Sequence, residues 1–203
     1  MEIRSIATIG ELSAAIAFFE QVFHTHRQLF SDENSPYAYA AWEPRFLEDP
    51  SLLVTAFDSG SIVGTAWGRG DNASVTVGPV AVAGEYRGQG IGFSLLHELE
   101  NRCLKLGIGF LCLGALEEAE EFYLKCGYQP NLLIQAKKPV TLDELRRENA
   151  VYAEEWTFED EVDVRLCLRT PAIDKQLQRH YDETFPGCST QIWFMKRLAG
   201  AAS

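Results

Sequence analysis

A glycine-rich segment between a predicted strand and a predicted helix has the residue types for anion chemistry. It runs from Val80 to Gly92 and contains four glycines and one arginine, Arg87. Glycines let a backbone approach a ligand closely, and consecutive N–H groups at a helix start bind phosphate well. The segment therefore predicts an anion site, although glycines at such a joint are also common as simple turn geometry.

Two well-known phosphate-binding motifs do not fit this segment. The dinucleotide-binding fingerprint requires glycine at position 93, which is Phe93 here. The P-loop requires Gly-Lys followed by Ser or Thr, and the segment has no lysine. A different kind of anion site is therefore predicted.

A second segment with possible chemistry follows after one more helix and strand. Residues 119–128 read Ala-Glu-Glu-Phe-Tyr-Leu-Lys-Cys-Gly-Tyr, which predicts a short helix with carboxylates at its start and a glycine stop. Tyr123 lies 31 residues after Gly92 (123 minus 92). A tyrosine on such a helix is often a core residue, but a phenol can also act as a general acid.

Together the two segments resemble the GNAT superfamily of acyl-CoA-dependent N-acetyltransferases. Arg87 to Gly92 is similar to the family's motif A, Gln/Arg-x-x-Gly-x-Gly/Ala, and residues 119–128 are similar to its closing helix. The resemblance implies a mixed α+β fold of the α/β class, the GNAT acyltransferase fold, with a central, mostly antiparallel sheet flanked by helices. It covers residues 1–136, and residues 137–203 are expected to form a C-terminal β-α-β-type extension that packs on the core or dimerises.

The resemblance also implies an acetyl-CoA cosubstrate, no metal, and a role for each matching residue. Backbone N–H groups at the turn hold the pyrophosphate, and the preceding strand edge pairs with the pantetheine amides. A backbone N–H near Val82 donates to the thioester oxygen, and the catalytic residue, Tyr123, protonates the departing thiolate. The implied cofactor-binding residues are Val80, Ala81, Val82, Arg87, Gly88, Gln89, Gly90, Ile91, Gly92, Ala119 and Tyr123.

Two positions depart from the family pattern. Leu116 stands where family members often place an asparagine that contacts pantetheine, and no Asp or Glu occurs from Val75 to Val82 to act as general base. A water chain or a loop carboxylate such as Glu33 or Glu43 is left for that role. The chain is therefore expected to be an acetyltransferase acting on a primary amine, with a catalytically silent acyl-CoA sensor or partner-binding module as the alternative.

Hydrophobic periodicity predicts the elements that position these residues. The predicted order is a strand at 2–6, a helix at 11–30, a loop with a short helix at 31–50, a hairpin of strands at 52–57 and 62–67, a strand at 73–82, a helix at 88–106, a strand at 110–114, a helix at 117–126 and a strand at 132–137. Gly78-Pro79 interrupts the third strand, which predicts a bulge or a place where pairing stops.

The C-terminal third predicts two weakly similar strand-proline-helix units. Strands are expected at 162–169 and 191–196, one helix starts at a capping box, and a second helix follows Thr170-Pro171. The similar positions are Pro139, Leu145 and Arg147 in one unit and Pro171, Leu177 and Arg179 in the other. An acidic run at 154–163 between the strands is interpreted as a solvated hairpin, or as a surface that steers a cationic acceptor.

Composition limits the function classes. The chain has 29 acidic and 18 basic residues, a net charge of −11, which argues against nucleic-acid binding and favours a cationic amine as acceptor. No apolar run reaches the length of a membrane span, and the first residues do not resemble a signal peptide. Five cysteines without Cys-x-x-Cys spacing are expected to be reduced, which favours a cytoplasmic location. His24 and His26 predict no metal site, because i,i+2 residues on a helix face different directions. A homodimer is possible through the extension's edge strands.

Overall fold

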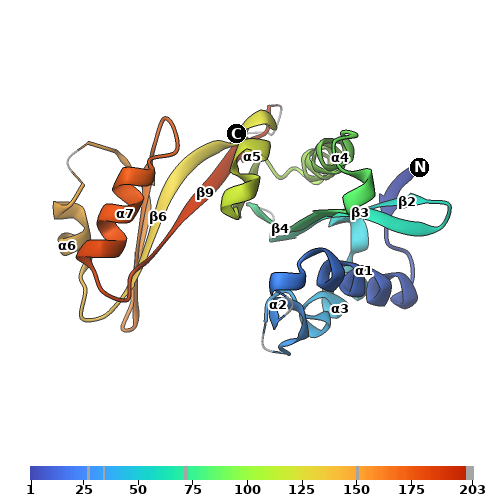
Figure 1. The fold of residues 1–203 in the computed structure, drawn as a ribbon, viewed down its shortest axis with the longest axis horizontal. Helices are drawn as coiled ribbons and strands as arrows, with labels where there is room; N and C mark the ends of the chain where they lie inside the picture. Colours follow the sequence, from blue (N-terminus) through green and yellow to red (C-terminus); the bar gives the residue numbers. More distant parts are fainter. Residues whose placement is uncertain (27, 34, 71–72, 150, 200–203) are drawn as a thin grey trace. The chain divides into compact units, whose positions relative to one another are not determined.

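A computed structural model describes residues 1–26, 28–33, 35–70, 73–149 and 151–199 (Figure 1). These residues divide into two compact units, one of residues 1–111 with 197–199 and the other of residues 112–196. Each unit contains an antiparallel sheet with helices packed on it, so the predicted mixed α+β class is confirmed. None of the described helices is long and apolar enough to cross a bilayer.

The sheet of the first unit contains four antiparallel strands in the order β1-β2-β3-β4. Their bounds are β1 Glu2–Ser5, β2 Leu53–Asp58, β3 Ser61–Gly70 and β4 Val75–Val82. Ser59 and Gly60 both have positive φ at the turn between β2 and β3, as a tight hairpin requires. The predicted hairpin is therefore confirmed, with the first strand shifted by one residue and the second strand longer than expected.

Helices cover both faces of this sheet (Figure 1). On one face lie α1 Ile9–Val22, α2 Gln28–Ser31 and α3 Tyr39–Glu48, and α4 Ile91–Lys105 lies on the other. Trp67 of β3 packs edge-on against Phe19 of α1, with ring centroids 4.9 Å apart. Gly64, on the opposite face of the same strand, lies against Leu95 and Ile91 of α4. The alternation of side chains along β3 therefore divides the core into two layers.

The predicted interruption at Gly78-Pro79 is a β-bulge. Gly68 pairs with Val77 and Ala66 pairs with Val80, so two residues of β4 lie opposite Trp67 of β3. Position 78 also has little room, because a Cβ there would lie 3.1 Å from Cη2 of Trp42 in α3. A glycine is therefore required for the indole to pack against the bulge.

The second unit contains the rest of the predicted core and the extension. Its elements are α5 Glu120–Lys125, β6 Gln129–Lys137, α6 Leu142–Arg147, β7 Glu154–Glu159, β8 Asp163–Arg169, α7 Lys175–Thr184 and β9 Ser189–Arg197. β5, Phe110–Gly114, crosses the boundary between the two units in the sequence. Within the unit, β6 pairs with β8 on one side and with β9 on the other. The strand that was expected to end the core therefore lies between two strands of the extension, and a domain boundary at residue 136 stays a prediction.

The strands of the second unit follow a split βαβ pattern. The order β9-β6-β8-β7 places β8 between β6 and β7, and β6 between β8 and β9. Each half is thus a strand, a helix and a parallel strand with one strand of the other half inserted. Nε of Arg147 donates to the carbonyl of Asp143 at 3.3 Å, and Nε of Arg179 donates to that of Lys175 at 3.2 Å. The two predicted strand-proline-helix units correspond to β6 with α6 and to β8 with α7.

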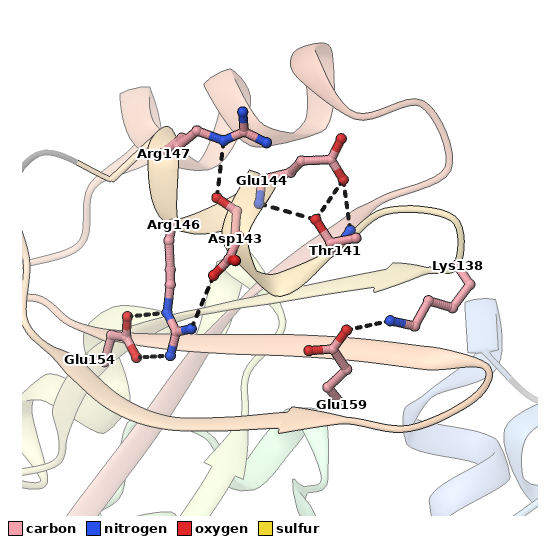
Figure 2. Close-up of polar contacts among 8 residues, drawn as sticks. All are labelled: Lys138, Thr141, Asp143, Glu144, Arg146, Arg147, Glu154 and Glu159. Atoms are coloured by element: carbon pink, nitrogen blue, oxygen red, sulfur yellow. Dashed lines mark hydrogen bonds and ion pairs between the residues drawn. The ribbon is translucent and has the colours of Figure 1, made fainter.

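Ion pairs neutralise much of the acidic run. Arg146 of α6 binds both carboxylate oxygens of Glu154, at 2.7 and 2.9 Å, and Lys138 pairs with Glu159 (Figure 2). The predicted capping box of α6, made by Thr141 and Glu144, is also confirmed (Figure 2). The Arg146–Glu154 pair joins α6 to the edge strand β7, and the run is a hairpin surface on which several carboxylates are paired. The choice between a solvated hairpin and a steering surface stays a prediction.

Removing the Tyr181 hydroxyl is expected to destabilise the second unit. Tyr181 of α7 is fully buried and donates a hydrogen bond of 2.8 Å to the carbonyl of Leu145 in α6. Tyr181→Phe leaves this buried carbonyl without its donor, which costs about 1–2 kcal/mol. Urea unfolding followed by far-UV circular dichroism measures the loss. The partly exposed Tyr152–Asp174 bond is the control, and an equal loss in Tyr152→Phe would contradict the role of burial.

Candidate functional site

The glycine-rich turn joins β4 to α4 through a short 3₁₀ helix, Gly84–Tyr86. Gly88 and Gly90 have φ of +76° and +79°, a left-handed conformation that residues with a Cβ adopt at a cost. A Cβ at either position would meet no atom within 4 Å. The glycines are therefore needed for the backbone path of the turn and leave open space beside it.

The start of α4 has no side-chain cap. Gly90 is the N-cap residue, and the first described bond of the helical ladder runs from the N–H of Ser94 to the carbonyl of Gly90 at 3.0 Å. The N–H groups of Ile91, Gly92 and Phe93 consequently precede the ladder and have no intrahelical acceptor. Ser, Thr, Asp or Asn usually supplies one. A 15-residue helix also directs the positive end of its dipole there, so this position favours an anion.

Side chains of the turn bind its own backbone. Nε of Arg87 donates to the carbonyl of Val82 at 3.1 Å, and the Gln89 amide donates to the carbonyl of Glu85 at 3.0 Å. Arg87 is exposed, and no described carboxylate pairs with its guanidinium. The arginine therefore helps to form the turn and still adds a positive charge beside it.

The three strand residues of the predicted site differ in direction. The N–H of Ala83 donates to Val63 of β3 at 2.9 Å, and Ala81 pairs with Thr65. Because N–H and C=O directions alternate along a strand, the groups of Val80 and Val82 point away from β3. Val80 and Val82 thus direct their backbone groups away from β3, while those of Ala81 serve the β3 ladder.

Tyr123 lies in an aromatic cluster of the second unit. It is 7% exposed on α5, and its ring centroid lies 5.6 Å from Phe194 of β9 and 6.0 Å from Tyr128. Burial raises the pKa of Tyr123 above the ordinary value, with the nearby Cys126 thiol as a smaller cause. Its hydroxyl therefore stays protonated at neutral pH, as a proton donor requires. Ala119 is the N-cap residue of the same helix and is half-buried.

The acidic candidates for general base lie in the α2–α3 region of the first unit. The carboxylate of Glu43 accepts a hydrogen bond of 3.1 Å from the hydroxyl of Tyr39 one turn earlier on α3, and Glu33 is exposed. Glu43 is therefore engaged within its helix. Among the described residues, no three His, Cys, Asp or Glu side chains gather as a metal site would require.

One contact of the turn was not predicted from the sequence. The hydroxyl of Tyr86 donates to Oδ2 of Asp58, at the end of β2, over 2.8 Å. Tyr86 directly precedes Arg87, so its place in the motif was visible. Its partner was not, because the two residues lie 28 positions apart and meet only when the sheet has formed.

Comparisons with known proteins agree on one family. A family model described as the acetyltransferase (GNAT) family matches residues 17–128, more than half of the chain. No curated protein sequence gives a significant match.

Three solved structures share the fold at low sequence identity. An aminoglycoside 6′-N-acetyltransferase complexed with coenzyme A is 18% identical, with a TM-score of 0.52, and the match covers 86% of this chain and 100% of that chain. The PaiA N-acetyltransferase from Thermoplasma acidophilum, in complex with coenzyme A, is 18% identical with a TM-score of 0.51, and the match covers 83% of this chain and 98% of that chain. The N-acetylglutamate synthase from Neisseria gonorrhoeae, complexed with coenzyme A and N-acetyl-glutamate, is 15% identical with a TM-score of 0.50. That match covers 97% of this chain and 35% of that chain.

The family match includes both segments whose residue types indicated chemistry. Residues 17–128 contain the glycine-rich turn, the uncapped start of α4, and the helix that carries Tyr123. By this match, the chain belongs to the GNAT acetyltransferase family.

Proposed function

We propose that this protein transfers an acetyl group from acetyl-CoA to a primary amine, by direct attack in a ternary complex. The uncapped start of α4 carries the proposal, because it combines N–H groups that have no intrahelical acceptor, a helix dipole and glycines with open space around them. Membership of the GNAT family supports the reaction class. The three solved structures described above are complexes with coenzyme A, which supports the choice of cosubstrate.

In this proposal the first unit binds the cofactor. The N–H groups of residues 87–92 hold the pyrophosphate, and Arg87 adds a charge that a polyanion needs in a chain of net charge −11. The outward groups of Val80 and Val82 bond the pantetheine amides, and Ala81 fixes the strand between them. An N–H near Val82 donates to the thioester oxygen as negative charge develops there. Ala119 lies at the start of the helix that presents Tyr123.

The reaction forms one N–C bond and breaks one C–S bond. The neutral amine attacks the thioester carbon, and the tetrahedral intermediate expels the CoA thiolate. Tyr123 donates its phenolic proton to the thiolate and regains one from solvent, while the amine nitrogen loses its extra proton to water or to a loop carboxylate such as Glu33 or Glu43. A raised pKa keeps Tyr123 in the acid form that this step uses.

The proposed acceptor is a small cationic amine or a protein amino group. A net charge of −11 attracts a cation and repels an acidic substrate. Structures of the same fold include an aminoglycoside 6′-N-acetyltransferase and an N-acetylglutamate synthase, so the fold alone does not fix the charge of the acceptor. The net charge therefore favours the cationic class for this chain.

Calorimetric titration with acetyl-CoA and a thiol-release assay with a panel of amines test the proposal. We expect acetyl-CoA to bind at micromolar concentration and thiol to appear only with primary amines, fastest with polycationic ones. Absence of binding at high micromolar acetyl-CoA would sink the proposal.

A catalytically silent acyl-CoA sensor is the second candidate. The lack of a carboxylate between Val75 and Val82, and Leu116 in place of an asparagine, favour it. A sensor binds acetyl-CoA in the same titration but releases no thiol with any amine, so the two assays separate the candidates.

The extension and the cellular location complete the proposal. We place residues 137–203 as an addition to a core of residues 1–136, with homodimers formed through β7, whose outer edge pairs with no strand in the described chain. Light scattering coupled to gel filtration tests the dimer, and a monomer at all concentrations would refute it. Five free cysteines, four of them buried, fit a reducing compartment, and we therefore place the protein in the cytoplasm.

A further inference from the structure

Tyr86 connects the glycine-rich turn to a part of the sheet that is distant in sequence. Its hydroxyl donates to Oδ2 of Asp58 over 2.8 Å, from the last residue of the 3₁₀ helix to the last residue of β2. The other side-chain bonds of the turn, from Arg87 and Gln89, are local and bond carbonyls four or five residues back. In the described chain, Tyr86 thus supplies a side-chain hydrogen bond between the turn and the β2–β3 hairpin, beside the backbone bond from the N–H of Ala83 to the carbonyl of Val63.

Such a bond matters because the turn contains several glycines, which contribute no side chain to hold it. Cβ atoms placed at Gly84, Gly88 and Gly90 would meet nothing within 4 Å, so these positions make few packing contacts. Glycine loses more conformational freedom on ordering than any other residue. A turn ordered before binding presents its N–H groups without that entropic cost, and affinity rises accordingly.

The chemistry of the pair suits this purpose. A phenol that donates to a carboxylate makes a charge-assisted bond, which is stronger than one between neutral groups. The same contact raises the pKa of Tyr86, so the phenol keeps its proton. The Asp58 side chain is 38% exposed, and the pair therefore lies at the surface beside the turn, outside the buried core.

We propose that Tyr86 and Asp58 are a positioning pair that holds the glycine-rich turn in its anion-binding shape. The inference rests on the proposed function, in which this turn binds the pyrophosphate of CoA. Neither side chain is assigned a contact with the cofactor. Their effect is on the affinity for the phosphate-bearing part of the ligand, and the chemical step is unaffected.

Tyr86→Phe tests the proposal, because it removes the hydroxyl and keeps the ring. We expect the Kd for CoA to rise about 3–10-fold, the effect of one lost hydrogen bond. The KM for acetyl-CoA should rise by the same factor, while kcat and the KM for the amine stay unchanged. Calorimetry with the nucleotide half of CoA, 3′-phosphoadenosine 5′-diphosphate, should show the same factor, since that half carries the pyrophosphate.

A matched control is present in the second unit. Tyr152 donates to Oδ2 of Asp174 over 2.9 Å, the same pair of groups far from the turn in sequence, and Tyr152→Phe should leave the Kd unchanged. Asp58→Asn keeps an acceptor oxygen and should weaken CoA binding less than Asp58→Ala does. Tyr86→Phe is the cleaner variant, because Asp58 also lies 3.9 Å from the N-terminal amine.

The outcomes separate this inference from the function on which it rests. If the unsubstituted protein binds no CoA, the proposed function fails. If it binds CoA and Tyr86→Phe changes the Kd by less than twofold, the positioning pair is refuted and the function stands. A change for CoA without a change for the nucleotide half also refutes it, because the effect would then lie outside the phosphate turn. Thermal melting of each variant verifies that the compared proteins are folded.

Discussion

Tyr123→Phe is expected to lower the rate of acetyl transfer roughly 10²–10³-fold, within the range that one general acid contributes. The substitution keeps the ring that packs on Phe194 and Tyr128, so the aromatic cluster of α5 stays filled. It removes only the proton that the departing thiolate needs. Thiol release at saturating acetyl-CoA and amine measures kcat, and calorimetry should give a Kd for CoA within twofold of the unsubstituted protein.

Tyr128→Phe is the matched control for this experiment. Tyr128 is 1% exposed in the same cluster and receives no role in the reaction, so its kcat should not change. Equal losses in both variants would show that the cluster needs hydroxyl groups for structure and would remove Tyr123 from the mechanism. An unchanged kcat in Tyr123→Phe would do so directly.

The pH dependence offers a second measurement on the same hydroxyl. A phenol ordinarily ionises near pH 10, and an ionised Tyr123 could not donate a proton. Because burial raises its pKa, the acid form persists above that pH. We therefore expect that ionisation of Tyr123 causes no decrease in kcat between about pH 7 and 10. A descending limb in this range that the substitution abolishes would contradict the buried environment of Tyr123.

Sequence periodicity predicted most elements of the first unit but misjudged α1. One helix was expected at 11–30, whereas α1 ends at Val22 and the chain continues in two short helical turns, His24–His26 and Gln28–Ser31. Phe30, in the second of these turns, stacks on Phe19 of α1 with ring centroids 5.4 Å apart. The apolar spacing is compatible with one long helix, but Phe30 makes a tertiary contact with α1 instead. Periodicity along the chain cannot distinguish the two.

In the second unit the sequence predicted repeated units but not their pairing. β7 was missed as a strand, because three of its six residues are glutamates, and these resemble loop residues until Arg146, Arg169 and Lys138 neutralise them. The predicted start of α7 was also wrong. The helix begins at Lys175 after the Asp174 N-cap, whereas Thr170 is buried and bonds the carbonyl of Pro130. Both differences, the missed strand β7 and the wrong start of α7, arise from contacts with residues that are distant in sequence.

The candidate site divides in the same way. The turn and the helix start were predictable, because glycines and a missing cap are local features of the sequence. Tyr86–Asp58 and the packing of Trp42 on Gly78 were not, since each joins residues from separate elements. Local motifs therefore identify where a ligand is held, and tertiary contacts determine how firmly the holding backbone is fixed.

Gly90→Ala is expected to weaken CoA binding about 10–100-fold. Gly90 has a φ of +79°, so an alanine there destabilises the fold by about 1–2 kcal/mol or moves the turn out of its left-handed conformation. Either change disturbs the N–H groups of Ile91 and Gly92, and each hydrogen bond to a charged group that is lost weakens binding about 10-fold or more. A Cβ would also occupy the open space beside the turn, where the proposal places the phosphate. Calorimetry with CoA measures the change.

Gly107→Ala separates the effect of backbone strain from the effect on the ligand. Gly107 follows the other end of α4, has a φ of +78°, and likewise has no atom within 4 Å of the position that a Cβ would take. The two alanines should therefore cost similar stability in urea unfolding, because strain is the same and neither meets a clash. Only Gly90→Ala should weaken CoA binding, since only that glycine adjoins the uncapped N–H groups. Equal Kd values for the two variants would mean that the helix start does not bind the pyrophosphate, and the anion site would have to lie elsewhere in the chain.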